Sequence, residues 1–208
     1  MKKGFTLVEM LVVIGILAVL VGVSVGAYGP ATRRAQKARG QELVTNTKDA
    51  FEFLLQKRNE WPLVVLKNGS GAEGEITSEV GASLAKYGAV KLNFRKVESD
   101  GAEKYELVGL DQFGLVSPWA AAVIKQRLAK GGVSESTPVP SGATIKDHRL
   151  RFAIDDDYDG RVKVGVSASG RQRATTVRAS ACVWCCGYDG KFGTKDDIFS
   201  WTSAQEVK

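Results

Sequence analysis

The chain has 208 residues, of which 44% are hydrophobic and 25% charged, and its formal net charge is +6. This composition permits a packed core and excludes a wholly disordered chain, and the length allows one domain or a small domain with an appendage. The basic residues are spread along the sequence except for one short concentration between positions 33 and 39. No helix-turn-helix, zinc-finger or RRM pattern accompanies the charge, so we do not expect nucleic acid as a partner.

Residues 5–28 form a long apolar segment with a single formal charge, Glu9. A helix of this length, at about 1.5 Å per residue, covers a hydrocarbon core of about 30 Å, so we predict a membrane-spanning helix. The alternative is an ordinary signal peptide, cleaved before Tyr28. Two features favour the membrane helix: the uncharged stretch at 10–27 exceeds the usual signal-peptide length of about 7–15 apolar residues, and a signal peptide has no use for Glu9.

A carboxylate at membrane depth costs a few kcal/mol, and pairing with a positive charge offsets much of that cost. Cleavage between Gly4 and Phe5 would create an α-amino group on Phe5, four residues from Glu9. In an assembly of many copies, Glu9 could neutralise the amino terminus of a neighbouring subunit and fix the axial register between subunits. The sequence therefore indicates that Glu9 is an assembly residue.

The segment KKGFTLVE at positions 2–9 resembles the leader junction of type IV pilins and of type II secretion pseudopilins. The resemblance implies a prepilin peptidase that cuts after Gly4 and methylates Phe5, with Glu9 guiding assembly. It also implies a single-pass precursor in the inner membrane with a periplasmic head, which joins a periplasmic filament of its own copies and works with the inner-membrane secretion machinery. The major pseudopilin is the closest resemblance, and a type IV pilin or a minor pseudopilin is the alternative. From another class, the alternative is a secreted calcium-binding domain behind a signal peptide.

We expect four parts in chain order: the leader at 1–4, the transmembrane assembly helix at 5–28, its amphipathic continuation at 29–61 and the periplasmic globular head at 62–208. In the continuation, apolar residues recur at three- and four-residue steps, which predicts one buried stripe. Trp61-Pro62 ends the helix. The expected class is α+β and pilin-like, with the second half of the long helix packed on a C-terminal antiparallel sheet.

Within the head, the patterns predict a helix, a hairpin, a loop and further strands. They are the helix from Thr77 or Ser78 to about Tyr87, the hairpin strands 91–97 and 104–110, the loop 131–142, and strands at 148–154, 161–166 and 177–186.

Two acidic turns in the last third of the chain offer oxygen ligands of the kind that calcium prefers. One contains Asp155, Asp157 and Asp159 and matches the opening of an EF-hand loop, but Val166 stands where a bidentate Glu is expected. Its alternative is a solvated hairpin turn between the flanking strands.

The second turn is similar to the C-terminal calcium loop of the major pseudopilin. The matching residues are Asp189, Asp196 and Asp197, with Thr194 and backbone carbonyls as further ligands. Its alternative is a polar loop, and calcium is the favoured reading because three carboxylates fall within nine residues, among glycines.

The three cysteines, Cys182, Cys185 and Cys186, form the pattern C-x-x-C-C, and a four-ligand zinc site would need all three together with the sole histidine, His148. On a strand, Cys182 and Cys185 face opposite sides, so we expect packed thiols instead of a bridge. His148 has no identifiable partner in the sequence, and no serine lies in a G-x-S-x-G motif. We therefore expect a structural protein and not an enzyme.

Overall fold

The computed structural model describes residues 7–69, 73–86, 94–99, 102–107, 113–128 and 131–207. The expected leader at 1–4 and its junction with Phe5 lie outside these residues. The chain divides into two compact units, residues 1–36 and 37–208.

The first unit is helical throughout its described part. Helix α1 spans Leu7–Arg58, and Pro30 lies inside it. Pro30 lacks a backbone donor, and the nearby Thr32 hydroxyl donates to the carbonyls of Tyr28 (3.1 Å) and Gly29 (2.8 Å). The large aliphatic side chains that the structure describes in this unit, at positions 7–21, are between 47% and 80% exposed, which is typical of an interaction surface. No helix in the described residues carries an apolar stretch long enough to pass through a bilayer.

In the second unit, residues 37–58 of α1 pack on a four-stranded antiparallel sheet, which we call the central sheet. Its strand order is β1-β4-β7-β8. The strands are β1 (Gly74–Glu75), β4 (Arg151–Ile154), β7 (Ala181–Cys185) and β8 (Ile198–Phe199).

The predicted stripe of α1 is buried, and aromatic rings hold it to the central sheet. Phe51 is fully buried and stacks on Phe152 of β4 with ring centroids 4.9 Å apart. The ring of Trp61, just past the helix, packs in a T-shaped arrangement with Phe51, and their ring centroids are 6.3 Å apart. Where Gly40 lies on the same stripe, a side chain would collide with Ile198 of β8. Helix and sheet therefore approach closely along the whole second half of α1.

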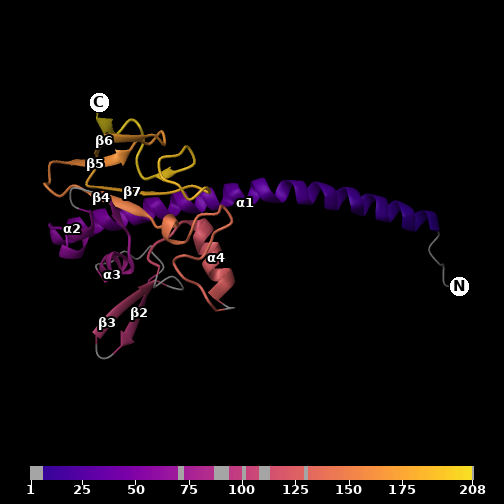
Figure 1. Cartoon of the computed structure of the whole chain (residues 1–208), viewed down its shortest axis with the longest axis horizontal. Coiled ribbons are helices and arrows are strands. Elements are labelled where there is room, and N and C mark those ends of the chain that lie inside the picture. The colour runs from indigo at the N-terminus through magenta and orange to yellow at the C-terminus, as the bar shows by residue number, and fades with distance from the viewer. Residues whose placement is uncertain are drawn as a thin grey trace. The chain divides into compact units, whose positions relative to one another are not determined.

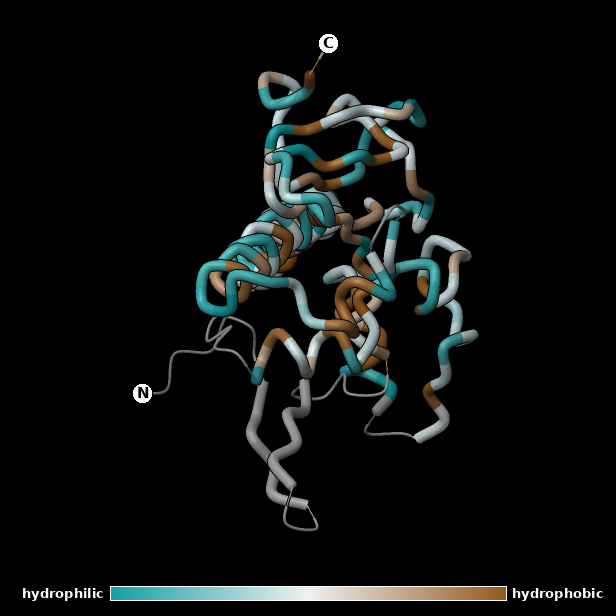
Figure 2. The backbone as a smooth tube through the Cα atoms, turned by 90° about the vertical axis from the view of Figure 1, so that its left-hand side faces the viewer, coloured by the Kyte–Doolittle hydropathy of each residue, from teal (hydrophilic) through white to brown (hydrophobic). Residues whose placement is uncertain are grey.

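A second sheet, the outer sheet, covers the other face of the central sheet (Figure 1). It is antiparallel, with the order β5-β6-β9, and consists of β5 (Arg161–Val166), β6 (Gln172–Arg178) and β9 (Glu206–Val207). Buried and exposed residues alternate along β5, and Figure 2 shows brown and teal alternating on the strands near the C-terminus. Because the central sheet is buried on both faces, all five residues of β7 are buried.

The remaining elements lie on the other side of α1 from the sheets or join them (Figure 1). They are α2 (Leu63–Gly69), α3 (Ser78–Lys86), the hairpin β2 (Phe94–Ser99) and β3 (Ala102–Leu107), α4 (Pro118–Leu128) and the 3₁₀ turn Lys146–His148.

The α+β class, the long N-terminal helix and the antiparallel pairing are confirmed, as are α3 and the β2–β3 hairpin, whose register runs from Phe94↔Leu107 to Ser99↔Ala102. Helices α2 and α4 were missed. The strand predicted at 177–186 is in fact the end of β6 and all of β7, and His148 belongs to the 3₁₀ turn that precedes β4. The predicted single sheet is two stacked sheets with a separate hairpin.

Replacement of Phe51 by Ala should lower the free energy of unfolding by about 3–5 kcal/mol, because it removes a fully buried ring from the helix–sheet contact. Phe53 is the matched control, since it lies on the same helix and is 46% exposed. Phe53→Ala should cost less than about 1 kcal/mol. Denaturant unfolding of the detergent-solubilised chain, followed by tryptophan fluorescence, measures both, and equal losses would contradict the packing described.

Candidate functional site

Only part of the N-terminal motif lies within the residues that the structure describes. Gly4 and Phe5 lie outside them, and Glu9 is the acidic residue in the first turn of α1. Glu9 is exposed within its own unit and stands among exposed aliphatic side chains. The Glu9 carboxylate therefore lies on an apolar helix surface, the kind of surface that packs against other apolar groups.

The loop between β7 and β8 gathers the three predicted carboxylates. Asp189, Asp196 and Asp197 each offer an oxygen within 4.8 Å of the others. The Thr194 hydroxyl lies between two of them, and it donates to Asp196 Oδ1 (2.6 Å) and Asp197 Oδ1 (3.0 Å). All four predicted ligands are thus brought together, and their oxygens converge.

Glycines give this loop its shape. A side chain on Gly187 would overlap the Asp196 carboxylate, and Gly190 and Gly193 have φ of 70° and 82°, which disfavours other residues. The Gly193 N–H donates to Asp197 Oδ2 at 2.7 Å. The glycines therefore allow the backbone to fold closely around the carboxylates.

Burial raises the pKa of the Asp197 carboxyl to about 6, although hydrogen bonds from Gly193 and Thr194 act in the opposite direction. The residue Asp197 is 7% exposed, whereas Asp189 and Asp196 are partly exposed. Removing a carboxylate from water is unfavourable unless a positive charge compensates it. Three convergent carboxylates, one of them buried, form an arrangement that a hard divalent cation would stabilise.

The acidic turn that contains Asp155, Asp157 and Asp159 has a structural role. Asp155 is buried and accepts hydrogen bonds from the Gly160 N–H (2.8 Å) and the Asp159 N–H (3.1 Å). Its backbone carbonyl accepts from Trp61 Nε1 at 2.7 Å, and the Trp61 N–H donates to Tyr158 Oη at 3.0 Å. The turn therefore holds the end of α1. Burial raises the pKa of Asp155.

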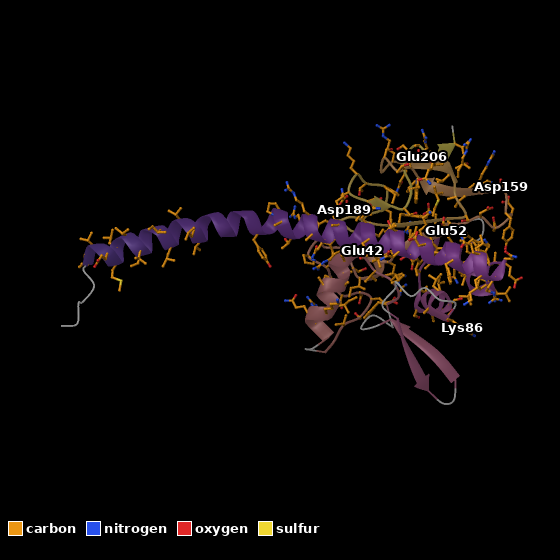
Figure 3. All side chains as sticks on the ribbon, turned by 180° about the vertical axis from the view of Figure 1, so that it is seen from behind. Glu42, Glu52, Lys86, Asp159, Asp189 and Glu206 are labelled. Atoms are coloured by element: carbon orange, nitrogen blue, oxygen red, sulfur yellow. The ribbon has the colours of Figure 1, made fainter. Side chains whose placement is uncertain are left out.

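The same turn was also read as a hairpin, which is wrong, because β4 and β5 belong to different sheets. Its Asp155, Asp157 and Asp159 oxygens also lie within 4.8 Å of one another. In Figure 3 the labelled Asp159 and Asp189 lie at opposite ends of the head, so the two acidic clusters are separate.

Sequence reasoning missed a buried polar cluster around His148. Its Nδ1 lies 2.7 Å from Ser117 Oγ and 3.2 Å from Cys186 Sγ. All three residues are fully buried, burial lowers the pKa of His148, and burial raises the pKa of Cys186. A buried thiol of raised pKa is a poor nucleophile. No sequence signal joins positions 117, 148 and 186.

The cysteines are free and buried, as expected. Cys185 packs in the core between α1 and the central sheet, and Cys182 packs between the two sheets. The two thiols therefore face opposite sides of β7, which confirms the prediction from strand alternation. Burial raises the pKa of Cys182 to about 12.

Comparison with known proteins identifies the family. Residues 1–25 match the family model described as the prokaryotic N-terminal methylation motif. The type IV major pilin protein PilE of Neisseria gonorrhoeae is 36% identical over 163 residues, which cover 76% of this chain and 97% of that pilin. The chain belongs to the type IV pilin-like family.

Other relatives of this pilin-like chain match over shorter segments. A fimbrial protein of Neisseria meningitidis serogroup B is 33% identical over 91 residues, which are 44% of this chain and 51% of that protein. Its serogroup A counterpart is 37% identical over 62 residues, or 30% of this chain and 36% of that protein. The chain thus spans about half or less of the length of these two relatives. No solved structure matches it.

The raised pKa of Asp197 in this pilin-like chain predicts a pH effect in the presence of a chelator. The pKa of Asp197 is 3.8 in the unfolded chain and about 6 in the folded chain. At a pH between these two values, the folded chain therefore binds more protons at Asp197 than the unfolded chain does. The contribution of Asp197 to stability should therefore rise as the pH falls from 7 to 5. Asp197→Asn cannot titrate, so the melting temperature of the wild type relative to this variant should increase over that interval. A difference that stays constant would contradict the raised pKa.

Proposed function

We propose that this chain is a structural subunit of a periplasmic pseudopilus in type II protein secretion. The observation that carries the proposal is the methylation motif at residues 1–25, followed directly by α1 with Glu9 in its first turn. A prepilin peptidase would cut after Gly4 and methylate Phe5. The apolar half of α1 would hold the precursor in the inner membrane and then line the filament, and no enzymatic step is required of the chain.

Physical chemistry supports the assembly role of Glu9. The new α-amino group on Phe5 is positive, and Glu9 lies four residues beyond it on a surface of exposed aliphatic side chains. When neighbouring helices cover that surface, the carboxylate loses water, and pairing with the amino terminus of an adjacent copy offsets the loss. The pair also fixes how far one subunit is shifted along the next.

The carboxylate loop and the cysteines support the pseudopilus in preference to a pilus. The loop resembles the calcium loop of the major pseudopilin, and the widely spaced C-terminal cysteine pair common among pilins is missing from the sequence. A type IV pilus is the second candidate, because the relatives found are named as pilins and fimbrial proteins. A strain that lacks this chain separates the two: it loses protein secretion in one case and surface fibres in the other.

We further propose that the loop of Asp189, Thr194, Asp196 and Asp197 binds calcium. The convergence of three carboxylates within 4.8 Å and the burial of Asp197 support this assignment. A bound ion would neutralise their mutual repulsion and tie the loop to β8, which packs on α1 at Gly40. The turn of Asp155, Asp157 and Asp159 is the weaker candidate, because Val166 stands where an EF-hand loop has its bidentate Glu.

Glu9→Ala should leave cleavage intact and impair filament assembly, because the adjacent amino terminus loses its counter-charge. Mass spectrometry of the subunit should give a mature chain that begins at methylated Phe5, and electron microscopy of sheared fractions measures the filaments. As a control, Gly4→Leu should accumulate uncleaved precursor. A mature chain that begins at Tyr28 would overturn the proposal in favour of a secreted domain, and normal filaments from Glu9→Ala would overturn the pairing.

Calcium should raise the melting temperature of the chain, because a ligand that binds only the folded state stabilises it by about 2.7 kcal/mol at a hundred times its Kd. Differential scanning fluorimetry in millimolar calcium and in chelator measures the shift. Asp196→Ala with Asp197→Ala should abolish it, whereas the matched pair Asp155→Ala with Asp157→Ala should retain it. If the second pair removes the shift instead, the ion is bound at the other turn.

A further inference from the structure

Strand β5 forms one edge of the outer sheet. The order β5-β6-β9 pairs it on one side alone, and in Figure 1 it lies on the side of β6 away from the C-terminus. An edge strand presents unpaired N–H and C=O groups, to which another chain can add as a further strand. Three alternate residues of β5, Arg161, Lys163 and Gly165, are exposed. We call the outer side of their backbone the free edge.

Hydrogen bonds on either side of the β5–β6 pair show which backbone groups face the free edge. In an antiparallel pair, the N–H and C=O of alternate residues point to the same side of a strand. The Arg178 N–H of β6 donates to a carbonyl next to β9 at 2.9 Å, on the side away from β5. Arg161 is opposite Arg178 in the register, so its backbone groups also point away from the partner strand. Alternation turns those of Lys163 and Gly165 the same way, and the Gly165 N–H donates to Glu73 Oε1 at 2.7 Å.

Glu73 occupies part of the free edge in the way that an added strand would. Its Oε1 accepts the hydrogen bond from Gly165 that a carbonyl of a partner strand would accept. Its Oε2 accepts from Arg151 of β4 at 3.3 Å, in an ion pair that is partly exposed. Among the described residues, no hydrogen bond reaches the backbone of Arg161 or Lys163 from this side. The edge is therefore covered at one end by a side chain that a peptide carbonyl can replace.

A hollow of about 300 Å³ borders the free edge at Arg161 and Lys163. Gly69 at the end of α2, Ile154 at the end of β4 and the acidic residues between positions 156 and 159 form its other walls. Successive side chains of a strand point to opposite faces. An added strand would thus place one set of side chains beside the two cations and the other set against Ile154, where small apolar groups fit.

The charge of β5 favours carboxylates on the added strand. Arg161 lies directly opposite Arg178, Lys163 follows two positions later, and β5 contains no acidic residue. Within the described part of the chain, none of these three cations has a carboxylate within 4.0 Å. Like charges directly opposite each other destabilise a sheet, so a carboxylate beside them would relieve a cost already present. The β5 strand of a second copy would bring more cations to the same place, and is therefore disfavoured.

We propose that the free edge of β5 binds an extended segment of another protein in which acidic and small apolar residues alternate. The segment would pair with Arg161, Lys163 and Gly165 in the antiparallel sense, as every strand pair of the described sheets does, and would displace Glu73. Its carboxylates would lie beside Arg161 and Lys163, and its apolar side chains would enter the hollow. This inference does not depend on the pseudopilus assignment.

The test measures the affinity of the full chain, solubilised in a non-ionic detergent, for a fluorescein-labelled octapeptide of alternating glutamate and valine. Fluorescence anisotropy gives the Kd. In the antiparallel pairing proposed, the glutamate N–H groups face β5 and the valine N–H groups face away. N-methylation of the glutamates should therefore abolish binding, whereas N-methylation of the valines should preserve it. Equal affinities of the two methylated peptides would overturn the proposal, because both keep the same charge and side chains.

Two pairs of protein variants test the edge itself. Lys163→Pro should bind the peptide about tenfold more weakly than Lys163→Gln, because proline removes a backbone donor at the edge and spares the pairing with β6. Glu73→Ala should tighten binding by about fivefold, because it releases the Gly165 N–H. The matched control is Glu75→Ala, which removes a carboxylate that pairs with Arg149 and should leave the Kd unchanged.

Two outcomes would contradict strand addition by an acidic segment. Equal effects of Glu73→Ala and Glu75→Ala would mean that the peptide senses only the overall charge. Equal binding of an octapeptide with lysine in place of glutamate would mean that the cations of β5 do not select the partner. If Lys163→Pro fails to fold, the two methylated peptides still decide the question on the unaltered chain.

Discussion

The head depends on the packing of Phe51 against Phe152, which joins the second half of α1 to the centre of the central sheet. Helix α1 alone could not bury its stripe, and a sheet of two long and two short strands could not bury its faces. Their contact creates one apolar layer, and the outer sheet creates the next. Since β7 is buried on both faces, its residues are all apolar or thiol-bearing, and this explains why three cysteines occur there or next to it without forming a bridge.

The carboxylate loop takes its position from the same packing. It leaves β7 after buried Cys186 and enters β8 at Ile198, whose side chain lies against α1 at Gly40. Both ends of the loop are thus fixed to the core, and the carboxylates have little room to separate. A cation at this loop would act on the contact between β8 and the helix, so its effect would reach the part of the head that a filament arranges around α1.

The features that sequence reasoning found are local. The leader motif, the stripe of α1, the β2–β3 hairpin and the carboxylate loop each lie within one short segment, where residue spacing fixes the geometry. Helix α4 was missed because its face is a run of alanine, valine and isoleucine without polar alternation, although Pro118 is a typical first helical residue. The turn after Ile154 was read as a hairpin because both flanking segments alternate, and alternation does not say which sheet a strand joins.

What sequence reasoning missed depends on contacts between distant residues. Ser117, His148 and Cys186 come from three separate segments, and only the fold brings the two partners to the histidine ring. Charge behaves in the same way. Along the chain, Arg161 and Arg178 are seventeen positions apart and look like scattered surface residues. Antiparallel pairing makes them neighbours, and the alternation that buries the valines forces both arginines outward. A chain with evenly spread cations can therefore present a strongly basic surface wherever two of its strands pair.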